Sequence, residues 1–172
     1  MAQQDLLLPW LSAQENITIG QRLRGEIPDI SRARMMLSQV GLEGYEKALP
    51  ETLSGGMKQR VALARTLMED RPIILMDEPF SALDAITRLR LQELTVNLLR
   101  GRTIIFVTHD PLEALRISDH IYIVSGKPAQ IEPLDSSYSK IPKDPSSKSF
   151  LKAQADLIRL LDDADRLTNA QK

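Results

Sequence analysis

Two adjacent carboxylates, Asp77 and Glu78, end the short apolar run Ile73-Ile74-Leu75-Met76. Such a continuous run predicts a strand of a parallel sheet that is buried on both faces. Open parallel sheets bind their ligands at the carboxyl ends of the strands, so Asp77 could hold Mg²⁺ beside a nucleotide. Glu78 could then polarise an attacking water. The alternative is a plain strand exit whose acidic residues cap the next helix.

A second candidate site is Ser54-Gly55-Gly56, which precedes the predicted helix Met57–Met68. Glycines let the backbone approach a ligand closely, and the N-terminus of a helix offers unpaired N–H groups and partial positive charge. Both properties suit a phosphate group. The alternative is an ordinary serine cap followed by a glycine turn, and these residues alone do not separate the two.

A histidine, His109, follows a second apolar run, Thr103–Val107, which predicts another buried strand. At the end of that strand the ring could donate a hydrogen bond to a phosphate oxygen or to the attacking water. A lone histidine is more often structural, and the second histidine, His120, is assigned no role.

The order and spacing of these groups make the combined signal specific. Ser54 precedes Asp77 by 23 residues, and Glu78 precedes His109 by 31 residues. Each group falls at a predicted boundary between a loop or strand and the next element. Chance agreement of the whole set is improbable, so the three candidates are taken together.

The elements that must position these residues alternate between helices and strands. Ser12 and Glu15 form a candidate capping box for a helix toward Arg24. Further elements are expected at Ser31–Val40 (helix), Met57–Met68 (helix), Ile73–Met76 (strand), Ala85–Leu99 (helix), Thr103–Val107 (strand), Pro111–Ile117 (helix) and Ile121–Val124 (strand). The alternation indicates an α/β layer fold with a parallel sheet.

The last part of the chain differs in composition. Residues 127–149 contain four prolines and six serines, which predicts a linker or surface excursion. The segment Phe150–Leu167 then reads as an amphipathic helix, expected to pack on the domain or on a partner. Its apolar stripe consists of Phe150, Ala153, Leu157, Leu160, Leu161 and Ala164.

Composition narrows the class of protein. The chain has 172 residues, 42% of them hydrophobic and 26% charged, as in a soluble globular protein of roughly one domain. The net charge of -1 argues against broad nucleic-acid binding, and the absence of cysteine excludes disulfides, thiolate metal sites and cysteine nucleophiles. No segment resembles a membrane span or a signal peptide, so a cytoplasmic protein is expected.

Several motifs resemble those of the nucleotide-binding subunit of ATP-binding cassette (ABC) transporters. Residues 53–60, Leu-Ser-Gly-Gly-Met-Lys-Gln-Arg, resemble the ABC signature, and residues 73–79 resemble Walker B with its catalytic glutamate. Residues 81–84 resemble the D-loop, and Thr108-His109-Asp110 resembles the switch histidine. Gln3 falls where the Q-loop glutamine stands, with Gln4 as the other candidate.

The resemblance implies an α/β fold of the P-loop NTPase (RecA-like) class, an ABC ATPase core with a helical subdomain at about residues 11–70. It covers residues 1–132, which leaves 133–149 as a linker and 150–172 as a C-terminal helix and tail. The stretch Leu7-Leu8-Pro9-Trp10, followed by Glu15-Asn16, is similar to importer ATPases of the nitrate/sulfonate/taurine group, which includes hydroxymethylpyrimidine uptake systems.

The resemblance also implies roles for individual residues. Glu78 and His109 would be catalytic, and Gln3 and Asp77 would bind Mg²⁺. The residues implied in binding ATP are Gln3, Ser54, Gly55, Gly56, Gln59, Asp77 and Asp84. The implied partners are a second ATPase subunit in a head-to-tail dimer, a membrane permease and, indirectly, a solute-binding protein. The chain would be cytoplasmic and peripheral on the inner face of the membrane.

One family feature is missing from these residues. ABC ATPases hold the β- and γ-phosphates with a loop of the pattern Gly-x-x-Gly-x-Gly-Lys-Ser/Thr, called Walker A, and this sequence has none. The domain is therefore expected to be N-terminally truncated. Without the strand that feeds this loop, Ile104–Val107 should expose apolar faces and unpaired backbone groups. The isolated chain is expected to be poorly stable and to hydrolyse ATP weakly.

Three functions fit the pattern to different degrees. The first is an ATP-hydrolysing subunit of an importer for a small organic solute. The second is a non-catalytic partner that supplies Ser54-Gly55-Gly56 to a full-length ATPase, although an intact Glu78 disfavours it. The third, a soluble ABC protein of repair or translation, is disfavoured by the Leu-Pro-Trp segment and by the lack of a basic surface.

Overall fold

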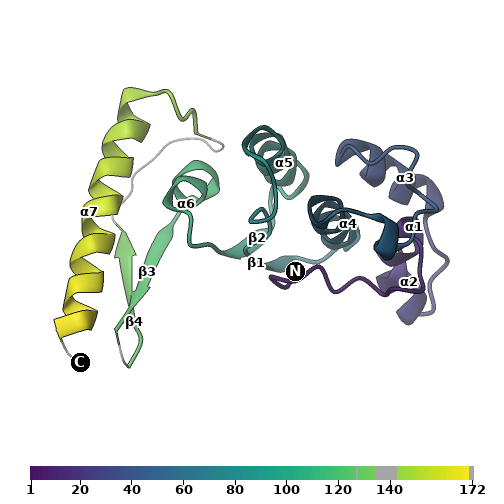
Figure 1. Cartoon of the computed structure of the whole chain (residues 1–172), viewed down its shortest axis with the longest axis horizontal. Coiled ribbons are helices and arrows are strands. Elements are labelled where there is room, and N and C mark those ends of the chain that lie inside the picture. Colours follow the sequence, from purple (N-terminus) through teal and green to yellow (C-terminus); the bar gives the residue numbers. More distant parts are fainter. Residues whose placement is uncertain (127, 135–142, 171–172) are drawn as a thin grey trace. The chain divides into compact units, whose positions relative to one another are not determined.

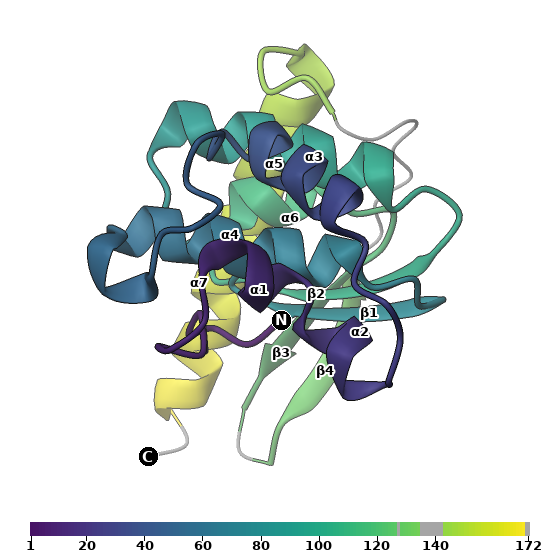
Figure 2. The same cartoon turned by 90° about the vertical axis from the view of Figure 1, so that its right-hand side faces the viewer.

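A computed structural model shows two units, Met1–Val107 and Thr108–Lys172. It describes residues 1–126, 128–134 and 143–170, with side chains up to residue 162. Figures 1 and 2 show the elements from two directions. No helix of the described residues is long and apolar enough to cross a membrane.

The first unit begins with short helices around the predicted capping box. The side chain of Ser12 caps α1 (Ala13–Ile17), and the reciprocal bond from Glu15 is present, as predicted. The expected single helix is divided, because α2 (Ile19–Leu23) starts after a break at Thr18. There the Thr18 hydroxyl donates to the carbonyl oxygens of the preceding turn, a local bond that competes with regular helix geometry.

Two longer helices complete the helical part of this unit. The helix α3 (Ile30–Gln39) is capped by Asp29 and is followed by Gly41 at a φ of +70°, a conformation that favours glycine. After a 3₁₀ turn (Pro50–Thr52), α4 (Gly55–Met68) is capped by Ser54. Both helices were predicted within two residues at each end.

The helices α1, α3 and α4 pack on one another around an apolar core. Its fully buried apolar side chains include Ala13, Ile17, Ala33, Leu37, Val61 and Leu63, none of which is exposed at all. This packing makes the helical part a core in its own right.

The sheet of the first unit has two strands in parallel. The strand β1 (Ile73–Asp77) pairs in register with β2 (Thr103–Val107), and α5 (Ala85–Leu98) connects them, as the alternating pattern predicted. In both views α4 and α5 lie on the same side of the strands (Figures 1 and 2). On that side the ring of Phe106 lies 6.0 Å from that of the buried Phe80.

The pattern of both apolar runs predicted strands that are buried on both faces, and this is wrong. The second expectation, that Ile104–Val107 exposes apolar side chains, is confirmed. Ile74 and Met76 are buried, but Ile73 and Leu75 are each 60% exposed. On β2, Ile105, which pairs with Leu75, and Val107, which pairs with Asp77, are also more than half exposed. The physical reason is that the described helices of this unit cover only one face of the two strands. The other face stays exposed, although its residues are as apolar as those of a sheet covered on both faces.

The second unit contains a helix, a hairpin and a long helix. The helix α6 (Pro111–Ile117) lies where it was predicted. The predicted third strand, β3 (Ile121–Ser125), is present, but it pairs antiparallel with β4 (Gln130–Leu134) instead of joining a parallel sheet. The prolines of this region predicted a linker, so β4 was not foreseen. The expected linker from residue 133 begins inside β4, and residues 135–142 lie outside the described residues.

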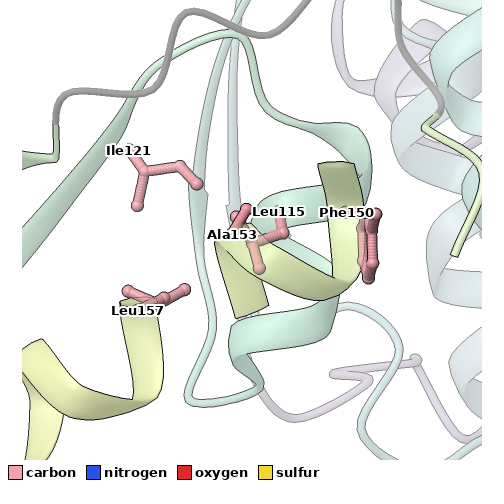
Figure 3. Packing of buried hydrophobic residues seen from close by; sticks show 5 residues of the cluster. All are labelled: Leu115, Ile121, Phe150, Ala153 and Leu157. Carbon is pink, nitrogen blue, oxygen red and sulfur yellow. The ribbon is translucent and has the colours of Figure 1, made fainter. Parts of the chain in front are cut away.

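The long helix α7 (Lys148–Ala170) closes the second unit, close to the predicted range. Phe150, Ala153 and Leu157 form a buried cluster with Leu115 of α6 and Ile121 of β3 (Figure 3). The rest of the predicted stripe behaves differently. Leu160 and Leu161 are exposed by 44% and 37%, and the side chain of Ala164 lies outside the described residues.

Candidate functional site

The turn after β1 places Glu78 in an uncommon backbone conformation. Its φ is +44°, in the left-handed region that non-glycine residues seldom adopt. Three hydrogen bonds fix it there. The Glu78 amide donates to the Val107 carbonyl at 2.9 Å, and its own carbonyl accepts from the Ser81 amide and hydroxyl at 3.3 and 3.1 Å. Strained residues of this kind persist only where their surroundings hold them, and they are frequent at active sites.

A glutamine from α4 reaches the same turn. The Gln59 side chain is only 4% exposed, and its amide nitrogen donates to the carbonyl oxygens of Glu78 at 3.3 Å and Pro79 at 3.1 Å. The helix that opens with the glycine turn is therefore bonded directly to the residue that follows β1.

The beginning of the chain lies against the end of β1. The Asp77 amide donates to the Met1 carbonyl at 3.0 Å, and the Gln3 side-chain amide donates to the Glu78 carboxylate at 3.1 Å. The structure thus brings Gln3, the first of the two candidate glutamines, to a carboxylate 75 residues later. The Asp77 side chain is exposed at this edge.

An arginine fixes the segment after Gln3. The Arg65 guanidinium, on α4, donates to the carbonyl oxygens of Asp5 at 2.7 Å and Leu6 at 2.9 Å. Leu6 has a φ of +46°, a second left-handed residue. Burial lowers the pKa of Arg65, but so strong a base stays charged at neutral pH. Nothing in the sequence pattern pointed to Arg65.

The Leu-Pro-Trp stretch is shaped from inside by Asn16. This fully buried side chain accepts from the Leu8 amide at 2.8 Å and donates to the carbonyl oxygens of Leu8, Leu11 and Ser12. One side chain thereby satisfies the backbone of a whole loop, while Trp10 at its tip is 71% exposed. The sequence singled out Asn16 only as part of the family resemblance.

The glycine turn presents its first two residues to solvent. Ser54 caps α4, its hydroxyl accepting from the Met57 amide at 3.3 Å, and both Ser54 and Gly55 are exposed. Open space surrounds Gly55, whereas a Cβ on Gly56 would come within 3.2 Å of the Ala82 carbonyl oxygen. Gly56 therefore lets the start of α4 lie against the loop that leads to α5.

Asp84 ends that loop and caps α5. Its carboxylate accepts from the Thr87 amide at 3.0 Å, and this bond holds the pKa of the exposed Asp84 side chain below its usual value. The Asp84 side chain is thus charged at neutral pH.

His109 belongs to the second unit, where it is exposed. The loop around it is fixed from both sides. The Thr108 hydroxyl donates to the buried Glu113 carboxylate at 2.9 Å and accepts from the Asp110 amide at 3.0 Å. Asp110 in turn caps α6. Glu113 was not foreseen, because a glutamate inside a short helix carries no signal of burial.

The charges at the end of β1 fit a magnesium site only in part. Among the described residues no three histidine, aspartate or glutamate side chains gather as a metal site. Mg²⁺ in phosphate-transfer enzymes uses one or two protein ligands and completes its shell with substrate phosphates and water. The exposed Asp77 carboxylate and the nearby Gln3 amide are donors of that number and kind.

The fold defines the class of protein to which these features belong. Solved structures that share it are ATP-binding cassettes. One is the dimeric cassette MJ0796 in a post-hydrolysis state bound to ADP and Pi, with a TM-score of 0.64 and 38% identity over 70% of this chain and 55% of that one. A second structure of the MJ0796 dimer matches equally well.

Sequence comparison gives matches to proteins of one family. Residues 1–81 match the family described as ABC transporter. An uncharacterised ABC transporter ATP-binding protein of Methanocaldococcus jannaschii is 42% identical over 94% of this chain and 62% of its own length. The aliphatic sulfonates import ATP-binding protein SsuB of Bacillus thuringiensis is 41% identical over 86% of this chain and 59% of its own.

The chain is thus a homologue of the ATP-binding proteins of ABC transporters and has the fold of their cassettes. It spans about three fifths of the length of these two curated relatives.

Proposed function

We propose that this chain forms part of the ATP-hydrolysing subunit of an ABC importer for a small organic solute. The observation that carries the proposal is Glu78, whose strained backbone is held at the end of β1 while its carboxylate accepts from Gln3. A carboxylate fixed beside an exposed aspartate suits a residue that orients water for attack on a phosphate.

The other side chains supply the remaining parts of this chemistry. Asp77 and Gln3 would hold Mg²⁺ together with the phosphates of ATP, and His109 would donate a hydrogen bond to the γ-phosphate. Ser54, Gly55 and Gly56 contact the nucleotide held by a second ATPase subunit, and Asp84 lies near that junction. The exposure of Ser54 and Gly55 at the N-terminus of the 14-residue helix α4 supports a phosphate contact.

The partners follow from the proposed role. Two similar proteins support it, because one is a dimeric cassette and the other is an import protein for aliphatic sulfonates. The subunit would bind a membrane permease through the Leu-Pro-Trp loop, where Trp10 is exposed, and would act indirectly with a solute-binding protein. It would lie in the cytoplasm, peripheral on the inner face of the membrane.

The 172 residues contain no loop that could cradle the β- and γ-phosphates of ATP. We expect these residues alone to hydrolyse ATP weakly or not at all, because the hydrolytic groups would lack a means of holding the phosphates in line. The proposed activity therefore refers to the assembly that the cell makes.

The test uses the protein as isolated from its source cells, with any subunits that accompany it. Glu78→Gln should lower the turnover of ATP by about 100-fold or more while ATP still binds. Glu93→Gln, which removes an exposed carboxylate from α5, is the matched control and should leave turnover unchanged. Wild-type turnover in the Glu78 variant would contradict the proposal.

A second candidate function is a non-catalytic subunit that lends the Ser54 turn to a full-length ATPase. The exposure of Ser54 and Gly55 at the N-terminus of α4 favours it, because a phosphate held by another chain could reach this turn. Gly55→Asp separates the two, because open space around Gly55 lets the fold accept a side chain there. A non-catalytic subunit would lose function with Gly55→Asp and keep it with Glu78→Gln. Co-purification with a longer ATPase would support this alternative.

A further inference from the structure

Gln59 is turned inward, toward the backbone of the turn that follows β1. Its side chain is 4% exposed, and its amide nitrogen donates to the carbonyl oxygens of Glu78 and Pro79. A glutamine amide has two N–H groups, and two acceptors lie within reach of them here. The expectation that Gln59 contacts ATP therefore has no support in this arrangement.

We propose that Gln59 is a positioning residue that holds Glu78 in its catalytic conformation. The inference rests on the proposed function of Glu78. The left-handed φ of +44° at Glu78 is unfavourable for a residue with a Cβ, so the surrounding bonds must maintain it. Val107 and Ser81 hold the turn from the sheet and from within. Gln59 adds the bonds that come from the helical part of the unit, from α4.

The two hydrogen bonds from Gln59 couple the position of the Glu78 turn to that of α4. The N-terminus of α4 is the Ser54 turn, and Gln59 lies on its second turn. A second contact joins α4 to the residues that follow this turn. A Cβ on Gly56 would lie only 3.2 Å from the Ala82 carbonyl oxygen, so Gly56 packs closely against that backbone. A displacement of α4 when its N-terminus meets a phosphate is therefore transmitted to the catalytic carboxylate of the same chain. Gln59 carries that coupling through two hydrogen bonds in a buried setting, where such bonds are strongest.

The test replaces the amide without changing the size of the side chain. Gln59→Met keeps the volume and the apolar stem but removes both donors. The matched control is Gln92→Met. It removes the amide of another buried glutamine, which is 1% exposed and lies on α5. Both variants are made in the protein as isolated from its source cells with its accompanying subunits. Two quantities are measured: amide hydrogen exchange of residues 77–83, and the kcat and KM for ATP.

Gln59→Met should raise the exchange of the Glu78 and Ser81 amides at least about tenfold. It should lower kcat by about 10- to 100-fold and leave KM within about twofold, since misplacement of a catalytic group acts on the chemical step. The control should change neither the exchange of residues 77–83 nor kcat by more than about twofold.

Three results would overturn the inference. Unchanged exchange at Glu78 would mean that Gln59 does not hold the turn. Raised exchange with normal kcat would mean a structural contact without catalytic consequence. A raised KM with normal kcat would mean that Gln59 contributes to binding ATP and not to positioning Glu78. If the wild-type protein hydrolyses no ATP, the proposed function fails, and the exchange measurement alone still decides whether Gln59 holds the turn.

Discussion

The helical part of the first unit and its sheet differ in how completely they bury their apolar residues. The helices α1, α3 and α4 enclose side chains such as Leu37 and Leu63 that have no exposed surface. The strands β1 and β2 bury one face and leave Leu75 and Ile105 more than half exposed. The helical part therefore buries its apolar side chains completely. The sheet is as apolar as a buried layer, but one of its faces is exposed.

The difference bears on the turn at Glu78, which is bonded to the helical part. Glu78 follows a strand with one covered face, and the bond from Gln59 anchors it to the well-packed α4. Arg65, also on α4, anchors the segment that carries Gln3. The rigid part of the unit thus positions the groups that extend from its less protected part.

The largest effect should come from truncating a side chain in the helical core. Leu63→Ala should lower the free energy of unfolding by about 2–5 kcal/mol, because it removes buried contacts and leaves a cavity. The same change at Leu75, which is 60% exposed, should cost less than about 1 kcal/mol. Urea unfolding followed by far-ultraviolet circular dichroism measures both. Equal losses would mean that the sheet face is covered in solution.

The next largest effect should come from Asn16. Asn16→Leu removes one hydrogen bond accepted and three donated by the side chain. The partly buried backbone groups of Leu8, Leu11 and Ser12 then lose these partners. A loss of about 2–3 kcal/mol is expected. Acrylamide quenching of Trp10, the only tryptophan, should become more efficient as the loop loosens. A stable variant with unchanged quenching would show that the loop is held by other contacts.

A smaller change in stability, with a clear change in association, should follow from a charge on the exposed sheet face. Ile105→Lys should alter the free energy of unfolding by no more than about 0.5 kcal/mol, since the side chain is 54% exposed. It should also reduce self-association of the chain, because it interrupts the apolar face. Sedimentation at several concentrations tests this. Arg90→Ala, at an exposed position on α5, is the control that should leave association unchanged.

The smallest effect concerns pH and the capping box of α1. Hydrogen bonds from Ser12 lower the pKa of Glu15 below its ordinary value of 4.5. The carboxylate therefore contributes stability at neutral pH, and this contribution is lost as the pH falls below that ordinary value through the lowered pKa. Glu15→Gln should flatten this part of the stability profile. An identical acid profile in wild type and variant would mean that the capping box adds nothing measurable.

Local patterns predicted most elements of the first unit. The capping box of α1, the serine cap of α4 and the β1–β2 connection depend on neighbouring residues and on hydrophobic period, which are visible in sequence. The strand β4 was missed because Pro133 is compatible with a strand edge but is more typical of linkers. The break at Thr18 was missed because a side-chain hydroxyl that bonds to its own helix leaves no pattern.

The sequence by itself determined the chemical inventory: the paired carboxylates after an apolar run, the glycine turn before a helix, and the histidine after a second run. These signals are local, so they survive without tertiary information. Only the tertiary structure decided that Gln3 meets Glu78, that Gln59 points inward and that Arg65 and Asn16 fix the intervening loop. Each of these contacts joins a side chain to the backbone or carboxylate of another element. Contacts of that kind depend on how the elements pack, which residue spacing does not encode.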